Sequence, residues 1–356
     1  MTTAYLNRIA TAVPEFDVHE PFIAFAAGML RSDRTRGLFR RMARVSGISR
    51  RFSVLNPIAS EDSESIYAAR FYERGGFPST AERMRVFEQN APRLAYRTLD
   101  RLALSEEERA RVTHVVVTSC TGMYAPGLDF EIMDHLRLRP TVERTMIGFM
   151  GCYAAMNALK VARHIVRSEP GAAVLVLNLE LCTLHLQETQ ELEQVLSFLV
   201  FSDGCAASLV TADETGLALD SFRSVVIPET RDLITWKIRE LGFDMLLSGR
   251  VPMEIARSLR GVAEEITGGR DAGEVDLWAV HPGGRSVLDA VEEGLGLREG
   301  ALEASRRVLE CFGNMSSATV MFVLEQVMRR AKAGQSGCAM SFGPGLTAET
   351  LLFHAV

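Results

Sequence analysis

The chain has 356 residues, of which 47% are hydrophobic and 24% are charged. That composition is typical of a folded globular protein, and it excludes both a disordered chain and a small module held together by disulfides. Asp and Glu (45) outnumber Lys and Arg (39), which gives a formal net charge of −6 and argues against nonspecific binding of nucleic acid.

The N-terminal segment does not have the pattern of a signal peptide. Residues 1–17 contain Arg8, Glu15 and Asp17 and lack an apolar core, so we expect a cytoplasmic protein. The apolar stretch at 22–30 is shorter than the roughly 18 residues that a membrane span needs, so we expect no membrane span. The six cysteines are scattered without a CxxC pair, which predicts free thiols and no metal site.

Residues 1 to about 110 read as helical and charged, and they carry little recognisable chemistry. From residue 113 the pattern changes to β-branched and apolar runs that are interrupted by glycine and proline. These runs predict strands at 113–119, 144–149, 172–179 and 205–210, and a helix over 154–166. Continuous apolar runs are typical of strands buried on both faces, so we expect a sheet covered by helices.

The C-terminal part repeats this order of strand, turn and helix. It has a predicted strand at 275–280, helices over 286–295 and 317–330, and apolar runs on both sides of Gly343-Pro344-Gly345. The repetition predicts an α/β fold with mixed sheets in two similar halves. We place these halves at residues 1–215 and 216–356.

Cys152 follows Gly151 and opens the alanine-rich predicted helix, so its sulfur would lie at a helix N-terminus. Free backbone N–H groups and the helix dipole favour a thiolate there, and a thiolate is the nucleophilic form of cysteine. The alternative interpretation is a small residue buried where a strand meets a helix.

Two further polar residues lie at glycine-flanked turns. His281 ends a predicted strand and precedes Pro282-Gly283-Gly284, and Asn314 follows Gly313 ahead of the last predicted helix. Taken singly, they are also interpreted as a hydrogen-bonded histidine at a strand end and an asparagine that caps a helix. Together with Cys152 they form a Cys/His/Asn set of the kind used in nucleophilic catalysis.

The motifs around these residues resemble those of the type III polyketide synthases, the chalcone synthase-like branch of the thiolase superfamily. The matching segments are Gly151-Cys152, Trp278-Ala-Val-His281-Pro-Gly-Gly, Gly313-Asn314-Met-Ser-Ser-Ala and Phe342-Gly-Pro-Gly-Leu-Thr. The resemblance runs from about residue 113 to the end and is weaker over the N-terminal third. It implies a thiolase-like, five-layered αβαβα fold and an acyltransferase that joins malonyl-CoA units to an acyl-CoA starter by iterative decarboxylative condensation.

The same resemblance implies a role for each residue of the set. Cys152 would hold the starter as a thioester, with His281 as an imidazolium partner that favours the thiolate. His281 and Asn314 would donate hydrogen bonds to the enolate that forms when malonyl-CoA loses carbon dioxide. The family also implies a homodimer and no metal or redox cofactor, because the CoA thioesters are substrates.

The resemblance extends to a substrate pocket. Phe201 and Phe243 resemble the two aromatic residues that separate the CoA tunnel from the cavity in this family, although ordinary core residues are the alternative. Other cavity-lining positions fall on Cys120, Cys182, His185, Ser316, Gly343 and Pro344. Cys120, Cys182 and His185 differ from the threonines of plant chalcone synthases, and the loop at 119–129 resembles bacterial alkylpyrone and alkylresorcinol synthases. We therefore expect a fatty acyl starter and a cyclised pyrone or resorcinol-type product.

An arginine cluster lies where the family places its contacts to the phosphates of CoA. Arginine is suited to bidentate phosphate recognition, and we assign CoA binding to Arg44, Arg50 and Arg51. The alternative is a solvated basic helix face.

Two other functions share parts of this pattern. A ketoacyl synthase III-like enzyme also uses a Cys/His/Asn set, but it would require an acyl carrier protein. A catalytically silent partner subunit would bind acyl-CoA without forming a thioester on Cys152.

Overall fold

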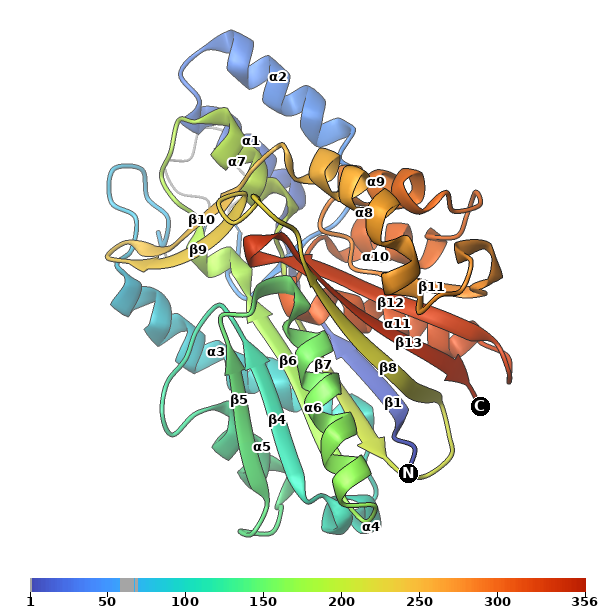
Figure 1. Ribbon diagram of the computed structural model, residues 1–356. Coiled ribbons are helices and arrows are strands. Elements are labelled where there is room, and N and C mark those ends of the chain that lie inside the picture. The colour runs from blue at the N-terminus through green and yellow to red at the C-terminus, as the bar shows by residue number, and fades with distance from the viewer. Residues whose placement is uncertain (1, 58–66, 68–69) are drawn as a thin grey trace.

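The structure is a computed structural model that describes residues 2–57, 67 and 70–356, in which strands and helices alternate along the chain (Figure 1). The strands are β1 (Tyr5–Ala12), β2 (Phe16–Asp17), β3 (Phe52–Ser53), β4 (His114–Ser119), β5 (Glu143–Gly148), β6 (Val174–Leu181), β7 (Asp203–Thr211), β8 (Leu217–Val226), β9 (Ile234–Arg239), β10 (Gly242–Leu247), β11 (Leu277–Val280), β12 (Ser336–Gly343) and β13 (Thr347–Ala355). The α-helices are α1 (His19–Met29), α2 (Asp33–Arg44), α3 (Thr80–Leu102), α4 (Glu106–Arg111), α5 (Leu128–Leu136), α6 (Ala154–Ser168), α7 (Leu192–Val200), α8 (Val251–Thr267), α9 (Arg285–Leu295), α10 (Glu303–Phe312) and α11 (Thr319–Arg330). Short 3₁₀ turns are η1 (Gly151–Tyr153), η2 (Cys182–His185), η3 (Ala272–Glu274), η4 (Ser316–Ala318) and η5 (Pro344–Leu346).

One large sheet has the strand order β11-β12-β13-β8-β1-β7-β6-β4-β5. Its two sides have the same pattern, because β4 runs parallel to β6 as β11 runs parallel to β12, and an antiparallel strand follows in each case. The two sides meet at β1 and β8, which share two residue pairs near Leu6 and Leu217. The sheet therefore consists of two similar halves joined at a narrow seam.

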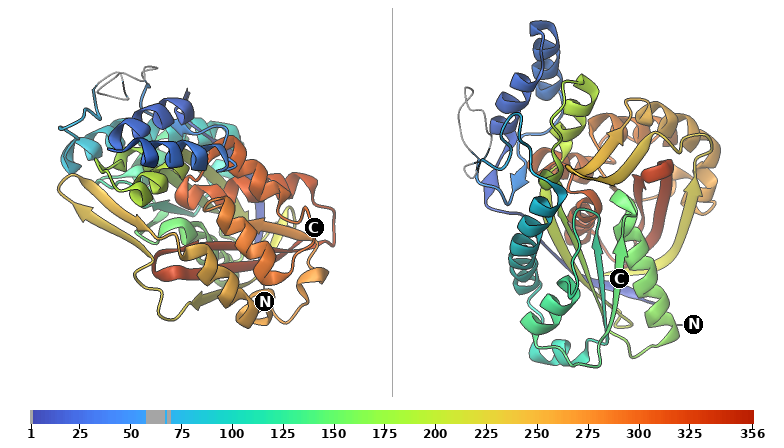
Figure 2. Two further views of the ribbon diagram at one scale, coloured as in Figure 1. Left: turned by 90° about the horizontal axis from the view of Figure 1, so that it is seen from above. Right: turned by 90° about the vertical axis from the view of Figure 1, so that its left-hand side faces the viewer.

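Three apolar cores separate the layers, and the alternation of side chains along each strand explains them. Val115 and Val117 of β4 belong to a core under α1, α3 and α5, whereas Val116 points to the opposite core around α6 and α11. In the other half, Ala279 of β11 faces this central core, and its neighbours Trp278 and Val280 face a third core under α8 and α9. Burial of each such valine stabilises the fold by about 1.5–3 kcal/mol. The order helix, sheet, helix, sheet, helix confirms the predicted fold, and Figure 2 shows the outer helices α3 and α9 on opposite sides of the sheets.

The predicted strands and helices after residue 113 are present, with bounds that differ by a few residues. The helical prediction for the first 110 residues is wrong at β1, which lies in the middle of the sheet between β7 and β8. The sequence of β1 includes Asn7 and Arg8, so its alternation is weak, and pairing with β7 rather than local pattern makes it a strand. No helix among the described residues is long and apolar enough to cross a membrane.

Candidate active site

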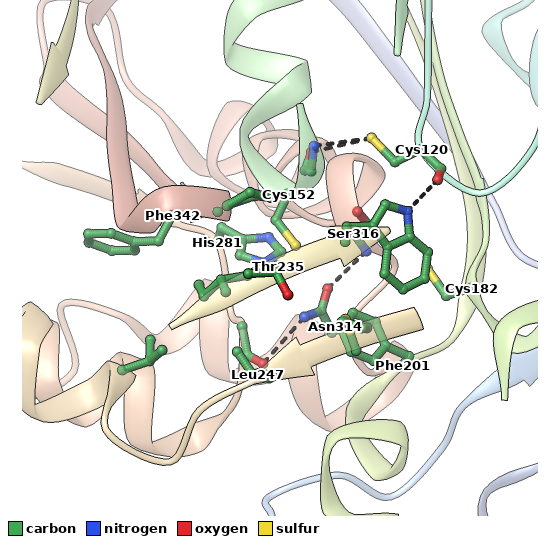
Figure 3. Close-up of a pocket in the computed structure, with 18 of the residues that line it drawn as sticks. Cys120, Cys152, Cys182, Phe201, Thr235, Leu247, His281, Asn314, Ser316 and Phe342 are labelled. Atoms are coloured by element: carbon green, nitrogen blue, oxygen red, sulfur yellow. Dashed lines mark hydrogen bonds between the residues drawn. The ribbon is translucent and has the colours of Figure 1, made fainter. Parts of the chain in front are cut away.

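A cavity lies where the turns of the two halves meet, and it contains the three residues of the Cys/His/Asn set (Figure 3). The polar or sulfur-bearing lining residues are Cys120, Thr121, Cys152, Cys182, His185, Thr235, Met245, His281, Asn314 and Ser316. The remaining lining is glycine, proline, aromatic and aliphatic: Gly151, Phe198, Phe201, Ile234, Trp236, Leu247, Val251, Ile255, Gly283, Val287, Phe342, Gly343 and Pro344. The cavity is therefore mostly apolar, with a few polar groups concentrated around Cys152.

Cys152 lies in η1, directly ahead of α6, and its sulfur points into the cavity (Figure 3). The turn requires glycine at position 151, where φ is +71° and a Cβ atom would lie 2.3 Å from Cδ of Pro344. Helix α6 then packs through Ala155, Leu159 and Ala162 in the central core. A fixed turn on a buried helix holds the sulfur in place.

His281 follows β11, whose hydrogen bonding continues through it because His281 N–H donates to the Met340 carbonyl oxygen at 2.7 Å. The side chain is 1% exposed, yet no described group forms a hydrogen bond with Nδ1 or Nε2. Buried polar atoms are nearly always paired in native proteins. Two unpaired ring nitrogens that face a cavity indicate a group positioned for a substrate.

Asn314 is fixed through its backbone and its side chain. Its N–H donates to the Val200 carbonyl oxygen at 2.8 Å, and its own carbonyl oxygen accepts the Ser202 N–H at 2.9 Å. Oδ1 accepts the Ser316 N–H at 2.8 Å, and Nδ2 donates to the Gly283 carbonyl oxygen at 3.3 Å. Because an amide nitrogen has two hydrogens, Asn314 has a second N–H, which is directed toward the Cys152 thiol and the space where a substrate oxygen would lie.

Burial decides the charge state of the unliganded site. It raises the pKa of the Cys152 thiol to about 12, although hydrogen bonds from Ser316 and Asn314 act in the opposite direction. Burial also lowers the pKa of His281 to about 3. Both directions are opposite to the thiolate and imidazolium that the family resemblance implies, because burial disfavours the charged forms. Burial therefore favours the neutral form of both groups.

The cavity lining includes seven of the eight residues predicted for the pocket: Cys120, Cys182, His185, Phe201, Ser316, Gly343 and Pro344. Phe243 is the exception. Its ring stacks on His185 at a centroid distance of 4.2 Å and lies behind the cavity wall, 2% exposed. Met245, two residues further along β10 and hence on the same face of the strand, lines the cavity instead.

Trp236 and the β9-β10 hairpin complete the wall, and the sequence analysis missed them. Trp236 Nε1–H donates to the Cys120 carbonyl oxygen at 2.8 Å, and its ring meets that of His185 edge to face. His185 Nε2 lies 2.6 Å from the Thr121 carbonyl oxygen, and its Nδ1 accepts the Phe243 N–H at 3.1 Å. The second bond requires an unprotonated Nδ1, so the first is a donation from Nε2–H. His185 thus connects the hairpin to the loop after β4.

Glu180 is a second residue that the sequence analysis missed. One carboxylate oxygen accepts the Cys120 N–H at 2.9 Å and the Thr121 hydroxyl at 2.8 Å, and the other accepts the Ser317 hydroxyl at 2.6 Å. Burial raises the pKa of this carboxyl to about 7, while these hydrogen bonds lower it. Glu180 therefore joins the loop of the N-terminal half to the η4 turn of the C-terminal half. A charged residue within an apolar strand pattern was the available signal.

The three arginines assigned to CoA lie in different surroundings. Arg44 is exposed and borders two surface grooves. Arg50 forms an ion pair with Asp17 at 3.0 Å and is also exposed. Arg51 is 2% exposed, and its guanidinium donates to the carbonyl oxygens of Phe198 and Phe201. Arg51 supports the cavity wall from behind, and its burial removes it from the predicted phosphate contacts.

The described residues contain no group of three or more His, Cys, Asp and Glu side chains placed to hold a metal ion. Cys182 and His185, which share the η2 turn, are both part of the cavity lining.

The fold and the site define a class of protein: a thiolase-like enzyme with a cysteine, a histidine and an asparagine at one cavity. Models of the N-terminal and C-terminal domains of chalcone and stilbene synthases match residues 6–214 and 218–356. The chain belongs to this family, the type III polyketide synthases, and is an enzyme of the acyltransferase type.

Known relatives cover almost the whole chain. Bisdemethoxycurcumin synthase of Oryza sativa subsp. japonica is 34% identical over 380 residues, covering 99% of this chain and 92% of the relative. The alpha-pyrone synthesis polyketide synthase-like protein Pks18 of Mycobacterium tuberculosis is 32% identical over 370 residues, covering 100% and 92%. The solved structure of PKS-I from the brown alga Ectocarpus siliculosus superposes with a TM-score of 0.89 at 29% identity, covering 100% of this chain and 99% of that one.

Proposed function

We propose that this enzyme loads a fatty acyl group from acyl-CoA onto Cys152 and extends it with malonyl-CoA by iterative decarboxylative Claisen condensation. It then releases a cyclised pyrone or resorcinol-type polyketide. The observation that carries the proposal is His281, whose two ring nitrogens have no described partner in a cavity shared with Cys152 and Asn314.

In the loading step, the Cys152 sulfur attacks the carbonyl carbon of the starter thioester. The neutral imidazole of His281 takes the thiol proton and returns it to the departing CoA sulfur, so that a C–S bond forms as another breaks. His281 can take that proton because its unprotonated ring nitrogen has no described hydrogen-bond partner in the cavity. Burial lowers the pKa of the imidazole and opposes this step, and the negative charge that develops on the neighbouring sulfur offsets that effect.

In the extension step, malonyl-CoA loses carbon dioxide, and the electron pair passes to an enolate on the thioester oxygen. An N–H of His281 and the second Nδ2–H of Asn314 supply the hydrogen bonds that stabilise this charge. The enolate carbon attacks the carbonyl carbon of the Cys152 thioester, so that a C–C bond forms as the C–S bond to Cys152 breaks. The extended chain is then held on CoA, and the departing Cys152 sulfur takes up one proton from water to regenerate the thiol. These steps balance with the two thioesters and that proton, so the proposal includes no metal or redox cofactor.

The fatty acyl starter is supported by the aliphatic part of the lining, which includes Ile234, Leu247, Val251 and Ile255. Trp236 also lines this cavity. Such a lining binds methylene groups at about 0.8 kcal/mol for each one buried. Arg44 and Arg50 remain the proposed contacts to the phosphates of CoA.

The experiment is mass spectrometry of products and of intact protein after incubation with malonyl-CoA and acyl-CoA starters from acetyl to long-chain. We expect an acyl adduct on Cys152, release of carbon dioxide, and pyrone or resorcinol masses that shift with the starter. Activity that requires an acyl carrier protein would replace the proposal with a ketoacyl synthase III-like function. Binding of CoA with no adduct and no carbon dioxide would indicate a silent partner subunit.

We also infer a homodimer formed through β5, in keeping with a cytoplasmic enzyme. Strand β5 is the end strand of the large sheet, and large apolar side chains are exposed around it: Met123, Phe130 and Met146 are 43–47% exposed. An unpaired strand edge beside apolar side chains is a ready surface for a second copy. Light scattering should give twice the chain mass, and Met146→Lys should shift it toward the monomer.

A further inference from the structure

Arg51 binds the backbone of the segment that ends α7, and this segment leads to Asn314. Its Nη1 donates to the carbonyl oxygens of Phe198 and Phe201 at 3.2 and 2.7 Å, and its Nε donates to His19 Nδ1 at 3.1 Å. The side chain is 2% exposed. Burial lowers the pKa of Arg51 to about 10, so the guanidinium remains charged at neutral pH and its hydrogen bonds are charge-assisted. A buried charge therefore holds two backbone oxygens of the cavity wall.

The same segment binds Asn314 through its backbone. The Val200 carbonyl oxygen accepts the Asn314 N–H at 2.8 Å, and the Ser202 N–H donates to the Asn314 carbonyl oxygen at 2.9 Å. Phe201 lies between these two residues and forms a parallel β-bridge with Asn314 (Figure 3). Arg51 thus holds the middle residue of a short extended segment whose neighbours fix both backbone groups of Asn314.

Arg51 also approaches the turn that carries Asn314. Gly313 has a φ angle of +68°, and a Cβ atom there would lie 2.9 Å from Cγ of Arg51 and 2.9 Å from the Val200 carbonyl oxygen. Both the backbone angle and the close approach require glycine at this position. The turn, the end of α7 and the Arg51 side chain are therefore packed as one unit.

Packing alone would constrain this wall weakly. Phe198 and Phe201 line the catalytic cavity, and together with Arg51 they also line a second, smaller cavity. Because space borders these rings in both cavities, they have fewer van der Waals contacts than the residues of a close-packed core. The hydrogen bonds from Arg51 are therefore needed to keep the backbone of this segment in place.

We propose that Arg51 is a positioning residue for Asn314 in the decarboxylation of malonyl-CoA. By holding the Phe201 carbonyl oxygen, Arg51 sets the position of Asn314 and hence of the Nδ2–H that donates to the enolate oxygen. This role rests on the proposed function, in which Asn314 stabilises the enolate. A displacement of about 1 Å at such a group can reduce a rate about 100-fold, so an indirect contact of this kind has a measurable effect.

The first test compares two rates in Arg51→Met, which keeps an apolar stem and removes every donor. We expect release of labelled carbon dioxide from malonyl-CoA to fall about 10–100-fold, whereas acylation of Cys152 should fall less than about threefold. Arg51→Lys should restore most of the decarboxylation rate, because one nitrogen of Arg51 makes both carbonyl contacts and lysine supplies one nitrogen with three donors. If Arg51→Met does not fold, Arg51→Gln, which retains an NH₂ group, takes its place with a smaller expected loss.

Arg83 provides a matched control. It is also a buried arginine, 0% exposed, and its Nη1 donates to two backbone carbonyl oxygens, those of Leu184 and Leu186, at 2.7 and 2.9 Å. These carbonyl groups flank His185, which lines a different part of the cavity from Asn314. Arg83→Met should therefore change decarboxylation and acylation by the same factor.

The decisive measurement is on the double variant Arg51→Met/Asn314→Ala. It should release carbon dioxide as slowly as Asn314→Ala alone, because a residue that acts through Asn314 has no further effect once that amide is absent. Losses that multiply in the double variant, or equal losses of decarboxylation and acylation in Arg51→Met, would overturn the proposal. No carbon dioxide from the unaltered chain would instead refute the proposed function, and denaturant unfolding of the same four proteins would then test the connection. Strictly additive changes in the free energy of unfolding would overturn it.

Discussion

The two halves of the molecule share one architecture and use it for different chemistry. Helices α6 and α11 occupy corresponding places in the central core, and each begins at a turn with positive φ angles, at Gly151 and at Gly313. The first turn holds Cys152, the proposed nucleophile, whereas the second holds Asn314, the proposed hydrogen-bond donor. Strands β4 and β11 correspond in the same way, and they are followed by Cys120 and His281. The residues at these turns therefore differ between the two halves. Because the halves face each other, the four turn positions together form one site.

The largest expected effect comes from replacing Cys152 or Cys120 separately by alanine, which tests whether the two turn positions have different roles. Cys152→Ala should reduce product formation by roughly 10³-fold or more, because no covalent intermediate can form. Cys120→Ala is the matched control, since it removes a thiol from the same cavity whose sulfur accepts the Gly151 N–H at 3.1 Å. We expect it to retain acylation of Cys152 and to lose less than about tenfold in rate, because one weak hydrogen bond is lost. Intact-protein mass spectrometry with product analysis distinguishes the two, and full activity of Cys152→Ala would refute the assignment.

Substitution of Asn314 tests whether its turn acts in only one step of the reaction, the decarboxylation of malonyl-CoA. Asn314→Ala should lower decarboxylation of malonyl-CoA by about 10²–10³-fold, the usual cost of losing one donor to a developing oxyanion. Loading of the starter on Cys152 should change much less, because that step does not form the same enolate. Release of labelled carbon dioxide and rapid-quench acylation measure the two steps separately. Equal losses in both would show that the substitution disturbs the whole turn. Ser316→Ala is the control, because it keeps the Ser316 N–H that Asn314 Oδ1 accepts.

The charge state of Cys152 predicts a distinct pH dependence. With its pKa raised to about 12, the thiolate fraction increases tenfold for each pH unit throughout the neutral range. The rate of alkylation of Cys152 by iodoacetamide should therefore rise without a plateau from pH 6 to 9. The lowered pKa of His281, about 3, means that no imidazolium titrates in this range. A plateau above pH 7 would instead show a resting thiolate paired with imidazolium.

The layered fold was predicted from a family resemblance that rests on local motifs, and the sequence also predicted that Cys152, His281 and Asn314 lie together, as they do at one cavity. The run Val115-Val116-Val117 is typical of a strand buried on both faces. The residues Cys152, His281 and Asn314 each lie at a turn marked by glycine. Strand β1 was missed, since its pairing with β7 spans about 200 residues of chain and leaves no local signal.

The pocket wall was predicted less well than the reactive set. Phe243 and Met245 are two residues apart on one strand, and which of them reaches the cavity depends on the packing of His185 behind it. Arg51 was assigned to CoA binding because it lies in an arginine cluster, whereas two backbone carbonyl oxygens at the end of α7 pair with it in the interior. Both errors arise from contacts between distant segments.

His185 gives the smallest and most specific of the expected effects, because it acts through the wall and not on the reacting atoms. His185→Phe keeps a ring against Phe243 but leaves the Phe243 N–H and the Thr121 carbonyl oxygen unpaired, at a cost of about 1–3 kcal/mol each. His185→Gln keeps one donor and one acceptor and should restore most of that stability. If His185 positions the hairpin, His185→Phe should shift the product distribution a few-fold in chain length while acylation of Cys152 continues, and His185→Gln should restore the original distribution. Two measurements on each variant distinguish a positioning role from a structural one: product ratios by chromatography and stability by denaturant unfolding. A merely structural histidine would alter the stability and leave the ratio of products unchanged.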